Sequence, residues 1–236
     1  MRGMKRRQLI RTACLALAPA LQAWAQSSLS EAAARGDLAA VNRLLAQGAD
    51  VEQRDAAGRT PVLAATAGNH VEVVRALIGR GANVNAQDAQ RDSAFLLAGA
   101  RGYTEIVRMA LAAGADLKST NRYGGTALIP ACHYGHVDTV RLLLTTAIDV
   151  DHVNNLGWTA LLEAVILGDG GAAHTEIVKM LIARRANVNL ADKQASPRWR
   201  TRANVGSTRS RSCWPTLGRA DAAWRACLPR RRLENP

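Results

Sequence analysis

One short motif, an alanine followed by Asp or Asn and then an aliphatic residue, recurs along this 236-residue chain and decides its fold. Its copies read QGADV at residues 47–51, RGANVN at 80–85, AGADL at 113–117 and RANVN at 185–189. The first three copies contain Gly48, Gly81 and Gly114, which are 33 residues apart. A regular period of this length indicates a chain built from repeated supersecondary units.

A second motif combines the residues of a tight turn with those of a helix start. It reads GRTPV at residues 58–62, GGTAL at 124–128 and GWTAL at 157–161, again at multiples of 33 residues. Asp55 and Asp88 are expected to start the turn through hydrogen bonds from the backbone to their side chains, and the glycines supply the positive φ that the turn needs. Thr60, Thr126 and Thr159 are expected to cap the helix that follows.

Each period has room for two helices. The first helix is expected to end in the left-handed conformation at Asn69, Gly102, Gly135 and Gly168. The second helix carries apolar residues at helical spacing, for example Val73, Val74 and Leu77. A single unit cannot bury that stripe, so the units must stack in a row. The sequence therefore predicts an all-α repeat fold.

These motifs resemble those of the ankyrin repeat family, and the resemblance covers about Leu29 to Gln194. It implies that residues 29–194 form an ankyrin-repeat solenoid of helix-turn-helix units joined by β-turn fingers. The expected units are a shortened first unit, four further units and the start of a sixth at Asp192: Leu29–Gln53, Asp55–Gln87, Asp88–Thr120, Asn121–Val153 and Asn154–Ala191. The fifth unit is five residues longer than 33, and the extra residues fall near Asp169–Ala173, between its two helices.

The third unit departs from the pattern at its turn. Arg91 stands where the other units have Gly, and Ser93-Ala94-Phe95 replaces the usual Thr-Pro-Leu. We therefore expect a distorted turn in this unit.

The resemblance also implies where a partner binds, because proteins of this family generally bind other proteins through the finger tips and the exposed side of each first helix. On this chain these protein-binding positions include Arg59, Gln90, Asp92, Arg101, Arg122, Tyr123, His133, Tyr134, Asn155 and Trp158. Tyr123 and Trp158 are expected to be the anchors, since exposed aromatic residues are typical of interfaces. Ile166 and Leu167 either join them or pack against a sixth unit or the long inter-helix loop.

Composition and charge limit the other classes of function. Aromatic residues make up only 4% of the chain, which favours close-packed helices over an aromatic-rich β-sandwich. No apolar run reaches the roughly 18 residues of a membrane-spanning helix, which excludes a polytopic membrane protein. The net charge of +12 suggests nucleic acid, but residues 26–194 carry a net charge of only −1. We expect no nucleic acid on the repeat body, which we predict to be a monomer that binds an unknown protein partner.

Residues 1–25 resemble an export signal. A basic start with five Lys and Arg residues is followed by the apolar stretch Thr12–Trp24, and Ala23 and Ala25 have the spacing that a signal peptidase accepts. We predict cleavage after Ala25, a periplasmic location in a bacterium, and contact with the membrane only during transit through the signal peptide. The run Lys5–Ile10 also resembles a twin-arginine signal, so both the twin-arginine (Tat) and the general secretory (Sec) routes remain open.

Residues 195–236 differ from the body in composition, with ten Arg against two acidic residues and no repeat pattern. One interpretation is a basic, disordered tail. The other is a frameshift at about residue 194. With free choice of wobble bases, the codons of this segment also encode GVTALAHARQRGFDEIAKLLANAGAR and then a stop overlapping Asp221. That string has the features of a final ankyrin unit.

Several residue groups suggest chemistry but have simpler explanations. The spacing of Cys132, His133 and His136 resembles that of a metal-binding cluster. However, His136 occupies the same repeat position as His70 and His174, so the repeat pattern explains it without a metal. The glycine-rich stretch 168–171 lacks the Lys and Ser/Thr of a phosphate-binding loop. We therefore predict no catalytic residues, no metal site and no cofactor. The predicted function is a non-enzymatic protein-protein interaction module, and the alternative is a protein that binds nucleic acid or an anionic surface through its basic tail.

Overall fold

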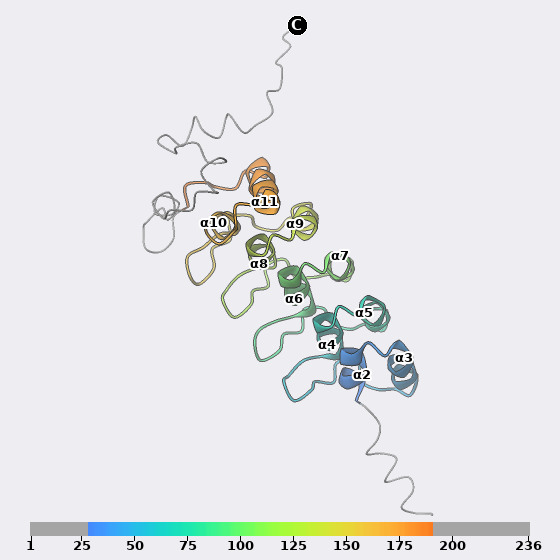
Figure 1. Cartoon of the computed structure of the whole chain (residues 1–236). Helices are drawn as coiled ribbons and strands as arrows, with labels where there is room; N and C mark the ends of the chain where they lie inside the picture. The colour runs from blue at the N-terminus through green and yellow to red at the C-terminus, as the bar shows by residue number, and fades with distance from the viewer. Residues whose placement is uncertain (1–27, 191–236) are drawn as a thin grey trace, which may run out of the picture. The chain divides into compact units, whose positions relative to one another are not determined.

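The computed structural model describes residues 28–190, which contain helices and turns and no strand. The helices come in pairs, with a first and a second helix in each repeat (Figure 1). The first helices are α2 (Leu29–Arg35), α4 (Pro61–Ala67), α6 (Ala94–Arg101), α8 (Leu128–His133) and α10 (Ala160–Ile166). The second helices are α3 (Leu38–Ala46), α5 (Val71–Ile78), α7 (Thr104–Ala112), α9 (Val137–Leu143) and α11 (Ala172–Ala183). The all-α repeat prediction is confirmed.

The chain divides into two compact units. The first unit contains the residues up to Leu97 together with Met109–Ala115, and the second contains Ala98–Arg108 together with the residues from Asp116 onward. In the first unit α2 packs on α4 and α3 on α5, and in the second α8 packs on α10 and α9 on α11 (Figure 1). Figure 1 also shows that, within each unit, the long turns project on the side of the first helices, away from the second helices.

Each unit has a core of aliphatic side chains contributed by both rows of helices. The apolar stripe Val73, Val74 and Leu77 is buried in the first unit, and Leu143 and Leu181 are buried in the second. Burying one such side chain stabilises the fold by about 1.5–3 kcal/mol. Stacking of neighbouring repeats therefore buries the apolar stripe that the sequence predicts on the second helices.

The turn chemistry predicted for Asp55 and Asp88 is confirmed, and an asparagine at the equivalent position uses it as well. The Asp55 carboxylate accepts hydrogen bonds from the backbone N–H groups of Ala57 and Arg59, both at 2.9 Å. Asn121 makes the same contacts through its amide oxygen, accepting from Tyr123 and Gly125. The side-chain oxygen thus shapes each turn, and a charged carboxylate is not required.

The expected distortion at Arg91 is wrong. The backbone N–H of Arg91 donates to the Asp88 carbonyl at 3.0 Å, the bond that Gly58 makes to Asp55 in the preceding repeat. Arg91 reaches this geometry with a φ of 60°, a left-handed conformation that costs a side-chain-bearing residue roughly 1–2 kcal/mol. The turn keeps its shape, and the backbone of Arg91 carries the strain.

The ends of the first helices agree with the sequence prediction except in the last repeat. Asn69, Gly102 and Gly135 have φ values of 56°, 72° and 74°. Gly168 does not adopt a positive φ, and Gly170 does so instead at 72°. The inserted residues move the left-handed position, and the helix that follows them, α11, has 12 residues.

The threonine caps are confirmed at only one of three positions. The Thr159 hydroxyl accepts from the backbone N–H of Leu162 at 3.2 Å. The hydroxyl oxygens of Thr60 and Thr126 are buried and have no hydrogen-bond partner within the described chain. Ser93, in the departing repeat, does cap its helix by accepting from Leu96.

The two end segments lie outside the described residues, including the predicted signal peptide with Ala23 and Ala25 and the segment 195–236. Between residues 28 and 190, no helix is long and apolar enough to cross a membrane.

Candidate functional site

The predicted binding residues of the first unit are engaged with their own turns. The Arg59 guanidinium lies 2.8 Å from the Asp55 carboxylate. Burial alone raises the pKa of Asp55, but the hydrogen bonds from Arg59 and Ala57 outweigh it and lower the pKa below its ordinary value. Gln90 and Asp92 each donate a backbone N–H to Asp88. These residues shape the turns and present little apolar surface.

The turn tips of the second unit are more apolar and lie next to each other. Tyr123 is 52% exposed and Leu156, at the equivalent place in the next turn, is 57% exposed. The backbone N–H of Asn155 donates to the Tyr123 carbonyl at 2.9 Å, which ties the two tips together. The Arg122 guanidinium lies over the Tyr123 ring at 4.8 Å from its centroid.

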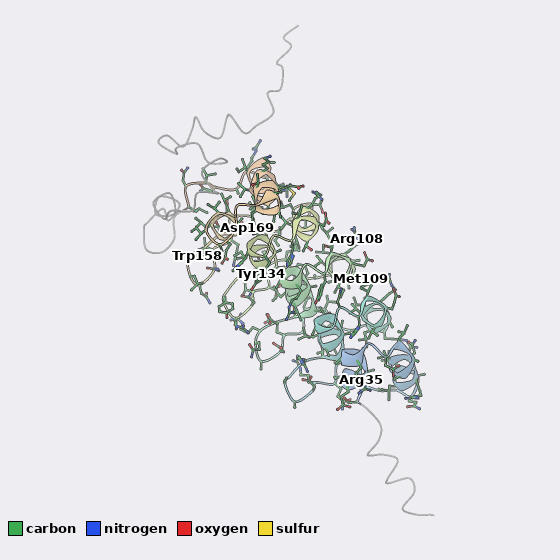
Figure 2. The ribbon with its side chains drawn as sticks, in the orientation of Figure 1. Arg35, Arg108, Met109, Tyr134, Trp158 and Asp169 are labelled. Atoms are coloured by element: carbon green, nitrogen blue, oxygen red, sulfur yellow. The ribbon has the colours of Figure 1, made fainter. Side chains whose placement is uncertain are left out.

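Trp158 is less accessible than the sequence prediction supposes. It is half-buried, and its backbone N–H donates to the Asn154 side chain at 3.0 Å. Figure 2 shows Trp158 in the turn before α10, on the side from which the turns project. Trp158 is therefore less exposed than Tyr123.

The ends of the first helices supply a second row of exposed side chains. Tyr134, which directly follows α8, is 62% exposed, and Leu167, which directly follows α10, is 41% exposed. The His133 ring stacks on the Tyr134 ring with centroids 4.4 Å apart. We call Tyr123, Tyr134, Leu156 and Leu167 the apolar surface of the second unit. Among the described residues of the first unit, Leu38 is the one large apolar side chain with comparable exposure.

A buried carboxylate lies behind this surface. Glu163 Oε2 is 2.9 Å from His133 Nδ1, and the Glu163 side chain is only 8% exposed. Its Oε1 accepts a hydrogen bond from the Asn154 side chain at 3.4 Å, whereas Oε2 has no partner with good hydrogen-bond geometry in the described chain. Burial raises the pKa of Glu163 above its ordinary value, although attraction to His133 acts in the opposite direction.

Sequence reasoning missed Glu163. The signal was present, because an acidic residue occupies a position where the other repeats have Ala64, Leu97 and Pro130. Glu163 also affects Cys132, which is fully buried. Burial and the nearby Glu163 charge both raise the pKa of this thiol far above its usual range. Cys132 is therefore a packing residue and not a reactive one.

The histidines that resembled metal ligands are used within the fold. Nε2 of His70, His136 and His174 lies 3.0, 3.2 and 2.9 Å from the carbonyl oxygens of Ala34, Ala100 and His133 in the preceding repeat. His133 and His136 thus have separate partners, Glu163 and the Ala100 carbonyl, and Cys132 is buried. Between residues 28 and 190, no group of three or more His, Cys, Asp or Glu side chains is arranged to hold a metal.

The inserted loop adds one contact to this pattern. His174 Nδ1 lies 2.9 Å from the Asp169 carboxylate, which also accepts from the backbone N–H of Gly171. The Gly171 hydrogen bond, followed by that of His174, lowers the pKa of Asp169. The predicted elongated inter-helix turn is therefore an organised loop at the edge of the apolar surface.

Comparison with known proteins agrees with this architecture. The family model described as ankyrin repeats (3 copies) matches residues 29–121 and 94–192. A solved ankyrin repeat domain from Acinetobacter baumannii AYE is 52% identical, with a TM-score of 0.69, over 70% of this chain and 85% of its own. The solved ankyrin repeat protein EF0377 is 41% identical, with a TM-score of 0.69, over 72% of this chain and 86% of its own. No curated protein matches. This chain belongs to the ankyrin repeat family.

Proposed function

We propose that this protein is a non-enzymatic module that binds a protein partner in the bacterial periplasm through the apolar surface of its second unit. Ankyrin repeats indicate a protein-protein interaction module in general. The observation that carries the specific proposal is the exposure of Tyr123, Tyr134, Leu156 and Leu167 on adjacent turns and helix ends. Exposed clusters of large apolar side chains mark interaction sites.

Tyr123 and Tyr134 are the best anchors within this surface. A tyrosine ring offers a large contact area with few rotatable bonds, and such residues are enriched among those that dominate binding. Both rings are also held in place before a partner arrives, Tyr123 by Arg122 and Tyr134 by His133. Pre-ordering reduces the entropy that is lost on binding.

The test compares capture of partners from a periplasmic extract by the unsubstituted mature chain and three variants of it. We expect Tyr123→Ala/Tyr134→Ala to lose the partners that the unsubstituted chain retains, with unchanged helicity. The Tyr123→Ala/Trp158→Ala variant tests whether Trp158 is an anchor for the partner. Leu38→Ala, in the first unit, is the matched control. Equal capture by all forms would show that the surface is not the binding site.

Export to the periplasm is part of the same proposal. It is supported by the basic start, the apolar stretch and the Ala23–Ala25 spacing of the sequence. Cell fractionation should recover a mature form whose first residue is Gln26. Loss of export in an Arg6→Lys/Arg7→Lys variant would indicate the twin-arginine route, and normal export would indicate the general secretory route. A full-length protein in the cytoplasm would contradict the proposal.

We further propose that residues 195–236 arise from a frameshift. The family match ends at residue 192, two residues before the predicted junction at Gln194. Re-reading the nucleotide sequence across codons 190–200 tests this directly. An additional G would restore the sixth unit. An unchanged read would keep the basic segment, and with it the alternative of binding to nucleic acid or an anionic surface. Such binding should weaken steeply with salt and require residues 195–236.

A further inference from the structure

We infer that Glu163 is a positioning residue for the apolar surface of the second unit. From inside the fold it holds the two rows of that surface, the turn tips with Leu156 and the helix ends with Tyr134, in a fixed relation to each other. The inference rests on the proposed function and adds a buried residue on which binding depends. Its basis is a chain of contacts that runs from one row to the other through Asn154, Glu163 and His133.

The chain of contacts begins at the turn tip of the fifth repeat. The side-chain oxygen of Asn154 accepts hydrogen bonds from the backbone N–H groups of Leu156 and Trp158, at 2.9 and 3.0 Å. The side-chain nitrogen of Asn154 donates to Glu163 Oε1 at 3.4 Å. Asn154 is only 4% exposed, and a buried amide group relies on partners within the protein. One asparagine therefore connects the conformation of the turn to the carboxylate on α10.

The other Glu163 oxygen reaches the helix end of the preceding repeat. Glu163 Oε2 lies 2.9 Å from Nδ1 of His133, which is the last residue of α8. The His133 ring stacks on the Tyr134 ring, with 24° between the two planes. The His136 ring also contacts Tyr134, in a tilted arrangement with centroids 6.0 Å apart. Since Tyr134 is largely exposed, turning the His133 ring away would remove the closer of these two ring contacts.

The histidines beside this chain of contacts have other roles. His136 directs Nε2 to a backbone carbonyl of α6 at 3.2 Å. His174 contacts the backbone carbonyl of His133 with one ring nitrogen and faces Asp169 with the other. Within residues 28–190, Glu163 is the polar side chain in contact with the His133 ring. Glu163 is therefore the residue that orients this ring.

The first unit shows that repeats form without this link. In the second and third repeats, Ala67 and Leu97 occupy the positions that His133 and Glu163 have in the fourth and fifth. A buried pair of a carboxylate and a cationic group also contributes little net stability, because desolvation offsets the attraction. Stacking of the repeats therefore does not require the link, and its position behind the apolar surface indicates a role in binding.

The positioning is tested first without a partner, by NMR of the full chain labelled at histidine. Glu163→Leu introduces the residue of the third repeat, and Glu163→Gln keeps a side chain that can still contact Asn154 and His133. The stacked Tyr134 ring shifts the His133 ring protons upfield. We expect Glu163→Leu to lose this shift and Glu163→Gln to keep it. An unchanged His133 signal in Glu163→Leu would overturn the inference.

Binding is then measured with a probe that uses the apolar surface. The probe is a synthetic peptide, selected from a random displayed library because it binds the unsubstituted chain and fails to bind Tyr123→Ala/Tyr134→Ala. We expect Glu163→Leu to bind this peptide at least about fivefold more weakly, because two rows of side chains are no longer pre-ordered. Glu163→Gln should bind it within about twofold of the unsubstituted chain. Circular dichroism checks that each variant is folded at the temperature of the measurement.

Leu162→Ala is the matched control in the same helix. It removes buried apolar volume next to Glu163 and leaves the polar contacts in place. It should lower the melting temperature and change the peptide affinity by less than about twofold.

Three outcomes of the binding measurement would overturn the inference and leave the proposed function standing. Glu163→Leu could bind as tightly as the unsubstituted chain, Leu162→Ala could lose as much affinity as Glu163→Leu, or Glu163→Gln could lose as much as Glu163→Leu. If no peptide in the library depends on Tyr123 and Tyr134, the proposed function fails and the inference fails with it.

Discussion

At the scale of single residues, the positions where this chain departs from its own repeat pattern are the informative ones. Arg91 replaces a glycine and keeps the turn at the expense of backbone strain. Glu163 replaces an apolar residue and is buried beside His133. The two residues differ in their consequence. The strain at Arg91 affects stability at every pH, whereas the buried Glu163 makes stability depend on pH.

Replacing Arg91 by glycine should stabilise the protein. The left-handed conformation costs Arg91 roughly 1–2 kcal/mol, while the greater freedom of glycine in the unfolded chain offsets about 0.5–1 kcal/mol of that gain. We expect a net increase of about 0.5 kcal/mol in the free energy of unfolding, measured by urea denaturation. Gly58→Ala is the reciprocal control, since φ is 75° there and an added Cβ would meet no atom closer than 3.5 Å. It should lower stability, and a rise would contradict this account of the turn.

Glu163 should make the protein less stable as the pH rises. Its pKa is raised in the folded state, so the folded protein binds the proton more tightly than the unfolded chain. The resulting stabilisation is complete below the ordinary pKa of about 4.5 and is lost as the pH rises through the raised value. The substitution Glu163→Gln keeps the shape of the side chain and removes this pH-dependent contribution to stability. Melting curves from pH 4 to 8 should be flatter for the variant, and parallel curves would rule out this role for Glu163.

At the scale of elements, histidine side chains connect successive repeats. His136 precedes α9 and contacts the Ala100 carbonyl of α6, and an added Cβ on Gly102 would lie 2.5 Å from its ring. The ring therefore fills a space that the glycine leaves open. The same arrangement recurs at His70 with Gly36. His174 differs because the inserted loop brings Asp169 to its second ring nitrogen.

Removing the His136 ring should destabilise the second unit. His136→Ala leaves the Ala100 carbonyl without its partner, which costs about 1–3 kcal/mol when the group is buried. Burial lowers the pKa of His136, despite the hydrogen bond to Ala100, so its contribution is present above pH 6.5 and is lost as the pH falls through the lowered value. Urea denaturation at several pH values should show a loss that shrinks toward acid. Asp138→Ala, on the exposed face of α9, should change stability by less than about 0.5 kcal/mol. If the two variants lose the same amount, the histidine has no linking role.

At the scale of the whole molecule, repeats gain stability by covering their neighbours. Leu181, Ile182 and Val188 belong to the last described repeat, within α11 and just after it. The structure buries Leu181 fully and leaves Ile182 and Val188 half-buried. A further repeat would therefore bury additional apolar surface, chiefly on Ile182 and Val188 and on the exposed Leu167.

A chain in which the alternative frame replaces residues after Gln194 should melt at a higher temperature than the chain with the present sequence. A sixth repeat would bury apolar surface worth about 25 cal/mol per Å², which amounts to several kcal/mol for a helix pair. Differential scanning calorimetry of the two full-length forms measures the difference. Equal melting temperatures would mean that the alternative-frame segment does not stack on the fifth repeat.

The sequence by itself determined the repeat period, the order of helices and turns, and the buried stripe of residues such as Val74 and Leu77. These features depend on the spacing of residues and on local backbone chemistry, and both can be read directly from the sequence. The tertiary structure decided the rest: that Gly170 and not Gly168 is left-handed, that Trp158 is half-buried, and that Glu163 contacts His133. The exposure or pairing of a side chain in a repeat depends on what the neighbouring repeat places against it, and that is set only when the helices pack.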